Sequence, residues 1–191
     1  MQLYLIRHPQ PEVAPDTCYG RSDLAANEAH CGQVLQVVSA RLPAGIPIIS
    51  SPLQRCAVLA HRLAEATQSA APLLDARLME LDFGTWELRR WDDIPRAEIE
   101  AWAQDPVNYR PGGGESVIAM ATRVIEFLQD LQQRYGRHDA GPAVVCHSGP
   151  IRTMLAYRAG MSASELATQA VASREKIQYG QCVEWGLPAL N

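Results

Sequence analysis

Short runs of consecutive apolar residues alternate along this chain with longer segments whose apolar residues recur every three or four positions. Runs of the first kind are typical of buried strands, and segments of the second kind are typical of amphipathic helices. Strands that alternate with helices predict an α/β domain built as a three-layer sandwich, in which a mainly parallel central sheet carries helices on both faces. The strands are predicted at residues 2–7, 46–50, 72–75 and 143–147, with a final edge strand within residues 176–185.

The predicted helix with the clearest start follows the second strand. Ser51 is its expected N-cap, Pro52 its first helical residue, and Gln54 completes a capping box. Arg55 then falls in the first turn, beside the exposed amides and the positive end of the helix dipole. Further helices are predicted over residues 27–42, from residues 115–116 to Gly136, from Pro150, and from a capping box at Ser162 and Glu165.

The segment from residue 83 to residue 114 breaks the regular pattern. It holds three of the four tryptophans, several prolines and a triple glycine. This composition indicates an irregular insertion that lies over a site like a lid, with one short helix at about residues 92–104. No linker or repeat divides the chain, so we expect residues 1–191 to form one domain.

Composition narrows the functions to consider. With 191 residues and 47% hydrophobic residues the chain can bury a core, and no stretch reaches the length of a membrane span. The N-terminus has no secretion-signal pattern, so we expect a soluble cytoplasmic protein without a membrane partner. The formal net charge of −4 argues against a nucleic-acid binder but not against a cleft for a small anion, because a few local arginines can set the field there. Five cysteines without a Cys-x-x-Cys pair indicate neither a disulfide framework nor a metal site.

Two of the predicted strands end in a histidine. Arg7 and His8 follow the first strand, and His147 closes the strand at 143–147. Carboxyl ends of parallel strands meet at one edge of a sheet, where α/β proteins bind their ligands. Taken alone, each histidine is more often a turn or satisfied polar residue, and Arg55 is as readily an exposed residue at a helix start that pairs with an acid. Together, the imidazoles and the bidentate guanidinium donors predict a site for phosphate.

Glu80 is the candidate proton donor. It lies in an apolar frame, residues 78–84, which would keep its carboxyl partly buried. Burial of this kind favours the protonated form that a general acid needs. A surface carboxylate in a loop is the alternative for this residue taken alone.

Five sequence blocks, in order along nearly the whole chain, resemble the histidine phosphatase superfamily in its phosphoglycerate mutase-like branch. The blocks are Arg7-His8 and residues 51–56, 80–87, 114–116 and 147–152. A further segment, residues 18–24 (CYGRSDL), looks most like the α-ribazole phosphatases, which act late in cobalamin synthesis.

The resemblance implies roles for residues of this chain. His8 would be the nucleophile that becomes a phosphohistidine, and Glu80 would protonate the leaving oxygen and later activate water. The residues implied to bind the phosphoryl oxygens are Arg7, Arg55 and His147. The candidate substrate contacts are Gln10, Tyr19, Arg21 and Ser148. The implied substrate is a small phosphorylated molecule, hydrolysed with no metal and no cofactor.

Three positions depart from the family pattern. Pro9 stands where a glycine usually follows Arg-His, Ala14 where an asparagine is common, and Leu88 where a glycine often follows Trp-Glu. Pro9 fixes one backbone angle and removes an amide donor beside the expected phosphate pocket. None of the three replaces a group with an implied bond-making role.

The leading interpretation is a metal-independent phosphomonoesterase, with α-ribazole 5′-phosphate as the favoured substrate. A phosphoglycerate mutase or a broad small-molecule phosphatase is the alternative among enzymes. A non-catalytic regulatory domain that binds a phosphorylated ligand is the alternative from another class, motivated by Pro9 and Ala14.

The aromatic residues of the insertion and the assembly of the chain are left open by the sequence. Trp91, Trp102 and Tyr109 would either line a substrate pocket or pin the insertion to the sheet, whereas Trp86 is expected to pack. The oligomeric state is not set, and a dimer is among the options.

Overall fold

The structure is a computed structural model that describes residues 1–136 and 140–188. Within these residues, the strands form one sheet of five in the order β3-β2-β4-β1-β5. Their bounds are Gln2–Arg7 (β1), Ile48–Ser50 (β2), Leu73–Leu74 (β3), Ala140–Cys146 (β4) and Cys182–Gly186 (β5). The first four are parallel to their neighbours, and β5 pairs antiparallel with β1 at the edge. The predicted α/β class, the mainly parallel sheet and the final edge strand are therefore confirmed.

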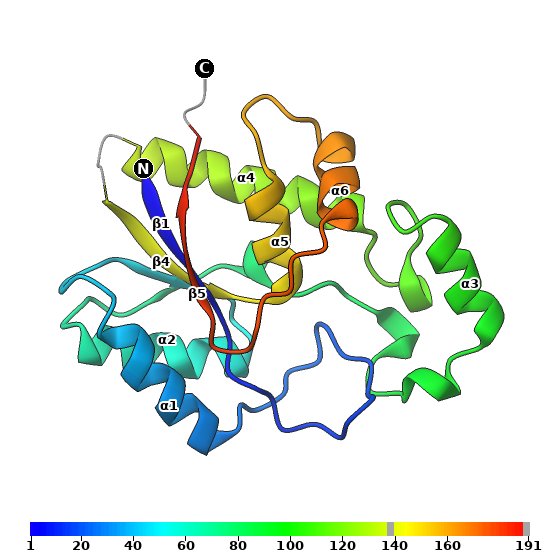
Figure 1. The fold of residues 1–191 in the computed structure, drawn as a ribbon, viewed down its shortest axis with the longest axis horizontal. Coiled ribbons are helices and arrows are strands. Elements are labelled where there is room, and N and C mark those ends of the chain that lie inside the picture. Colours follow the sequence, from blue (N-terminus) through cyan, green and yellow to red (C-terminus); the bar gives the residue numbers. More distant parts are fainter. Residues whose placement is uncertain (137–139, 189–191) are drawn as a thin grey trace.

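Helices cover both faces of this sheet (Figure 1). The helices α1 (Glu28–Ser39) and α2 (Gln54–Ala66) lie on one face, and α4 (Val117–Tyr135), α5 (Ser148–Ala156) and α6 (Ala163–Ala172) lie on the other. Each face has its own apolar core: Leu3 and Leu5 pack with the second group, while Ile6 packs with the first. The strand β1 is buried on both sides, which is why its sequence is a continuous apolar run.

The helix α2 begins at Gln54, and its N-cap is Leu53 rather than Ser51. The predicted capping box is wrong because the Ser51 amide still donates to the carbonyl of Val145, as in a continuing strand, at 2.9 Å. The capping oxygens come instead from Asp23, which accepts the Gln54 amide at 2.7 Å. Arg55 nevertheless lies in the first turn, as predicted.

The insertion contains α3 (Arg96–Gln104), which starts later than the predicted helix at 92–104. Residues Trp91–Asp93 form a separate 3-10 turn, and Pro95 is the N-cap of α3. Other predicted bounds also move: α1 is shorter than 27–42, β2 starts after Pro47, and residues 176–181 form a loop before β5. The strand β4 begins at Ala140 rather than at residue 143, and α5 begins at Ser148 rather than at Pro150. The capping box at Ser162 and the helix end at Gly136 are confirmed. None of the helices in the described part of the chain is long and apolar enough to cross a membrane.

Candidate active site

His8 and His147 lie side by side at the carboxyl edge of the sheet. His8 follows β1 and His147 follows β4, and these neighbouring strands pair with Arg7 opposite Cys146. The centroids of the two imidazole rings are 4.9 Å apart, with 60° between the ring planes. Both side chains are buried, His8 to 2% exposure and His147 completely. The structure therefore brings these two predicted site residues into contact.

His8 is held in one tautomer by the backbone. Its Nδ1 lies 2.6 Å from the carbonyl oxygen of Pro9, and because a carbonyl only accepts, Nδ1 carries the hydrogen. The Nε2 lone pair is then free. Burial, followed by the charges of Arg55 and Arg7, lowers the pKa of His8 well below its ordinary value. Pro9 thus supplies the acceptor that fixes the neutral imidazole, although it has no amide to donate.

His147 is also neutral and is fixed from the side of α2. Its Nε2 lies 2.8 Å from the Ser51 hydroxyl and 3.4 Å from the Cys56 sulfur. Burial, followed by the repulsion that a protonated His8 and the charged Arg55 would exert, lowers the pKa of His147 well below its ordinary value. Burial also raises the pKa of the Cys56 thiol, so the group beside the ring stays uncharged.

Two guanidinium groups flank the imidazoles. Arg7 ends β1 and donates to the carbonyl of Ile177 at 2.6 Å. Arg55 is fully buried and donates from its two Nη atoms to the carbonyls of Ser22 and Gly20, at 2.7 and 2.5 Å. In the described residues, the buried Nε atoms of both arginines have no hydrogen-bond partner. The site therefore has a net positive charge, because it combines two cations with two neutral rings. Its unused donors suit an anion.

Glu80 reaches the first turn of α5 from the segment before the insertion. Its carboxylate accepts from the amides of Gly149 at 3.1 Å and Leu81 at 3.0 Å. A Cβ on Gly149 would lie 2.2 Å from Oε1 of Glu80, so this close approach requires a glycine. Because Gly149 is two residues after His147, the same helix start positions the imidazole and the carboxylate.

A cavity of about 440 Å³ opens beside Glu80. Tyr19 and Ser148, both predicted as substrate contacts, line it together with Glu80. Tyr19 also lies beside Arg55 of the anion site, since the Arg55 guanidinium carbon is 5.6 Å from its ring centroid. The cavity and the anion site therefore meet at Tyr19 and Glu80.

The other two predicted contacts lie elsewhere. Gln10 is exposed, and its backbone bonds to His30 and Asn27 at the start of α1. Arg21 forms ion pairs with Glu115 at 3.4 Å and with Asp82 at 3.9 Å. Substrate contact by Gln10 or Arg21 stays a prediction.

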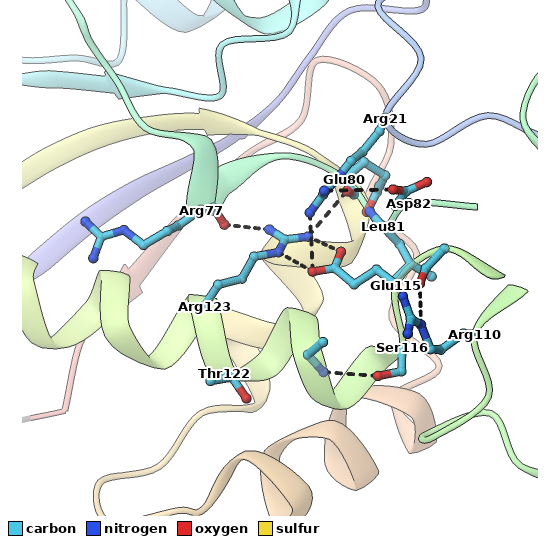
Figure 2. A network of polar contacts seen from close by, with 12 residues as sticks. Arg21, Arg77, Glu80, Leu81, Asp82, Arg110, Glu115, Ser116, Thr122 and Arg123 are labelled. Atoms are coloured by element: carbon cyan, nitrogen blue, oxygen red, sulfur yellow. Dashed lines mark hydrogen bonds and ion pairs between the residues drawn. The ribbon is translucent and has the colours of Figure 1, made fainter. Parts of the chain in front are cut away.

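Figure 2 shows the network that Arg21 joins. Arg123 of α4 donates to both carboxylate oxygens of Glu115 at 2.8 Å, to the carbonyl of Arg77 at 2.6 Å and to the carbonyl of Glu80 at 3.3 Å. These bonds fix the backbone on which Glu80 is carried.

Tyr179, Ser51 and Glu87 belong to the site but were not predicted as parts of it. The Tyr179 ring lies 5.6 Å from the His8 ring, and the Arg7 guanidinium carbon stands 3.8 Å from its centroid. Its hydroxyl is 2.5 Å from that of Tyr19. Nothing in the loop before β5 signals this position, whereas Ser51, expected only as an N-cap, and Glu87 stand inside the matched blocks 51–56 and 80–87.

Among residues 1–136 and 140–188, no group of three or more His, Cys, Asp or Glu side chains is arranged to hold a metal ion.

The chain is similar to known phosphatases along most of its length. Residues 3–184 match the family model described as the histidine phosphatase superfamily (branch 1). The phosphoserine phosphatase 1 of Hydrogenobacter thermophilus is 26% identical over 170 residues, which covers 86% of this chain and 79% of the relative. The adenosylcobalamin/alpha-ribazole phosphatase of Escherichia coli is 27% identical over 172 residues, which covers 87% of this chain and 83% of the relative.

A solved structure shares the fold. The alpha-ribazole phosphatase from Shigella flexneri superposes with a TM-score of 0.78 at 23% identity, covering 96% of this chain and 89% of the other.

Proposed function

The chain belongs to the histidine phosphatase superfamily, branch 1, and is an enzyme of phosphoric monoesters; within that family we propose that it is a metal-independent phosphomonoesterase acting through a phosphohistidine. One observation carries this proposal. Two neutral imidazoles have centroids 4.9 Å apart beside Arg7 and Arg55, and the hydrogen bond from Nδ1 of His8 to the Pro9 carbonyl leaves Nε2 of His8 unprotonated. Phosphoryl transfer requires an in-line nucleophile and fixed positive charge around the phosphoryl oxygens, and this arrangement supports both.

In the first step, Nε2 of His8 attacks the phosphorus in line with the leaving oxygen. A bond forms between nitrogen and phosphorus while the bond from phosphorus to the leaving oxygen breaks. Glu80, in its protonated form, gives its proton to that oxygen, so an alcohol departs and a carboxylate remains. Arg7, Arg55 and His147 donate hydrogen bonds to the phosphoryl oxygens as charge spreads over them.

In the second step, water attacks the phosphorus of the phosphohistidine. Glu80 takes a proton from the water, the bond between phosphorus and nitrogen breaks, and its electron pair returns to Nε2 of His8. Inorganic phosphate leaves, and the enzyme is restored. The neutral state of His8 supports both steps, because a protonated imidazole has no lone pair to give.

The favoured substrate is α-ribazole 5′-phosphate. The segment 18–24 and the similarity to the Escherichia coli relative support it. On this proposal the enzyme works in the cytoplasm, late in cobalamin synthesis, as one domain whose segment 83–114 lies over the site as a lid.

Phosphate release tests the proposal. The enzyme is treated with a metal chelator and offered α-ribazole 5′-phosphate, phosphoserine, phosphoglycerates and sugar phosphates at neutral pH. The proposal expects turnover with the chelator present and the highest kcat/KM on α-ribazole 5′-phosphate. Turnover confined to another ester would reject α-ribazole 5′-phosphate as the substrate. A requirement for bisphosphoglycerate would favour a mutase. No turnover on any ester would reject the phosphatase and favour a regulatory domain that binds a phosphorylated ligand.

A further inference from the structure

The cavity beside Glu80 has a place in the proposed reaction, on which the following inference rests. If Glu80 protonates the leaving oxygen, the rest of the leaving group must lie on the Glu80 side of the phosphorus. The space available there is the cavity of about 440 Å³ that Glu80 lines. A volume of this size falls in the range of about 300–1,000 Å³ that small-molecule sites occupy.

One wall of the cavity is aromatic and preorganised. The rings of Trp91 and Trp102 are parallel within 6°, with centroids 6.2 Å apart. Phe83 also lines the cavity and packs edge-on against both, at 6.0 and 5.9 Å. Trp86, which is fully buried and does not line the cavity, packs against the same pair at 6.5 and 5.8 Å. The wall is therefore fixed in position by the aromatic cluster of the insertion.

The charged groups that line the cavity are one arginine and one carboxyl among the described residues. Among its described lining residues the one cation is Arg152, whose Nη2 donates to the carbonyls of Ala170 at 2.9 Å and Ser173 at 3.0 Å. Arg152 is thus engaged with the end of α6 through Nη2, and its buried Nε has no hydrogen-bond partner among the described residues. The carboxyl that faces the cavity belongs to Glu80, and it would repel a carboxylate once it has given up its proton.

We propose that this cavity is a leaving-group subsite for an uncharged, planar ring system, and that Trp91 and Trp102 determine this specificity. A flat ring would stack on the tryptophan wall and exchange its hydration for apolar contact. A glycerate or a serine leaving group would gain little from these walls and would bring a carboxylate toward Glu80. The subsite therefore separates this chain from phosphatases of small charged esters.

Two synthetic esters test the proposal without the natural substrate. 2-(2-Naphthyl)ethyl phosphate and ethyl phosphate have the same primary alkoxide leaving oxygen and differ in the ring. We expect kcat/KM to be about a hundredfold higher for the naphthyl ester than for ethyl phosphate or phosphoserine. Trp91→Leu and Trp102→Leu should each reduce this ratio about tenfold, and Trp102→Phe should reduce it less.

The ratio of two kcat/KM values cancels losses of folded protein, and Trp86→Phe is the matched control. Trp86 belongs to the same cluster but does not line the cavity, so its variant should keep the ratio within about twofold. A ratio near unity, or a ratio that neither cavity tryptophan changes, would overturn the subsite while leaving the phosphatase proposal intact.

A binding measurement separates the two proposals. 2-(2-Naphthyl)ethanol should quench tryptophan fluorescence in the wild type and bind about tenfold more weakly to Trp102→Leu. Inactivity toward every ester together with this binding would reject the phosphatase and keep the ring-binding cavity. Absence of binding would reject the cavity proposal whatever the activity.

Discussion

The carboxylate of Glu87 and the guanidinium of Arg55 hold the same three-residue loop, residues 20–22, from its two sides. Glu87 accepts the three backbone amides of the loop at 3.0, 2.9 and 3.1 Å. Arg55 donates to two of its carbonyls at 2.5 and 2.7 Å. Because Glu87 also accepts the amide of Phe83 at 3.0 Å, it joins this loop to the segment that carries Glu80.

Glu87→Gln should weaken the site through Arg55. Burial raises the pKa of Glu87, but hydrogen bonds from Ser22 and from the backbone amides outweigh this and lower it below its usual value. A glutamine would turn an NH₂ group toward amides that need an acceptor, and the loop would shift. We expect kcat/KM to fall about tenfold to a hundredfold and competitive inhibition by inorganic phosphate to weaken in parallel.

Glu98→Gln is the control for this variant. Glu98 accepts the Trp86 indole N–H at 2.6 Å in the same insertion but does not touch the loop, so its variant should keep both constants within about twofold. In an Arg55→Ala background, Glu87→Gln should have little further effect. Fully additive losses would show that Glu87 does not act through Arg55.

Gly149→Ala should displace Glu80 and slow protonation of the leaving group. The added Cβ would lie 2.2 Å from Oε1, too close to be accommodated without movement. We expect kcat for an alkyl phosphate to fall about a hundredfold, the scale of a general acid, and to fall less for p-nitrophenyl phosphate, whose leaving group needs no proton. Gly32→Ala in α1, where a Cβ meets nothing within 4 Å, should keep full activity. Equal losses on both esters would contradict the assigned role of Glu80.

The free energy of unfolding should fall as the pH drops below 6.5, the ordinary pKa of histidine. His8 and His147 have pKa values well below this value in the fold, so they stay neutral there while the unfolded chain takes up protons. Below that pH, each histidine lowers the free energy of unfolding by up to about 1.4 kcal/mol per pH unit. Urea unfolding between about pH 7.5 and pH 5.5 measures the slope. His147→Asn should flatten it, and an unchanged slope would show that His147 titrates normally in the fold.

Leu88→Gly should stabilise the protein. Leu88 has φ of +63°, in the left-handed region that favours glycine, and it is 58% exposed, so little packing is lost. The free energy of unfolding should rise by about 1 kcal/mol, with activity unchanged. Arg90→Gly, two residues along and also exposed, has φ of −69° and should destabilise by about 0.5–1 kcal/mol. A stability loss in Leu88→Gly would show that the strain is absent.

Periodicity predicts the strands and the meeting of the two histidines because both follow from local rules. An apolar run of β1 or β4 must be buried, and parallel neighbours place their final residues at one edge. Arg55 in the first turn of α2 follows likewise from helical spacing. Leu88 stands where glycine is common in the family, and its backbone has the positive φ that favours glycine.

Contacts between distant parts of the chain decide the rest. The cap of α2 comes from Asp23, 31 residues before Gln54, so the nearer Ser51 is free to bond His147. Tyr179 meets Tyr19 across 160 residues, and no pattern in either segment encodes that pairing. Such contacts depend on how finished elements pack, which local propensity does not contain.

If His8 carries the phosphoryl group during turnover, that group can be trapped on its imidazole. The enzyme is mixed briefly with a radiolabelled phosphomonoester and quenched in alkali, where phosphohistidine survives. We expect acid-labile label on His8 of the wild type and no label on the His8→Ala variant. Equal labelling of both proteins, or turnover that persists in His8→Ala, would contradict it.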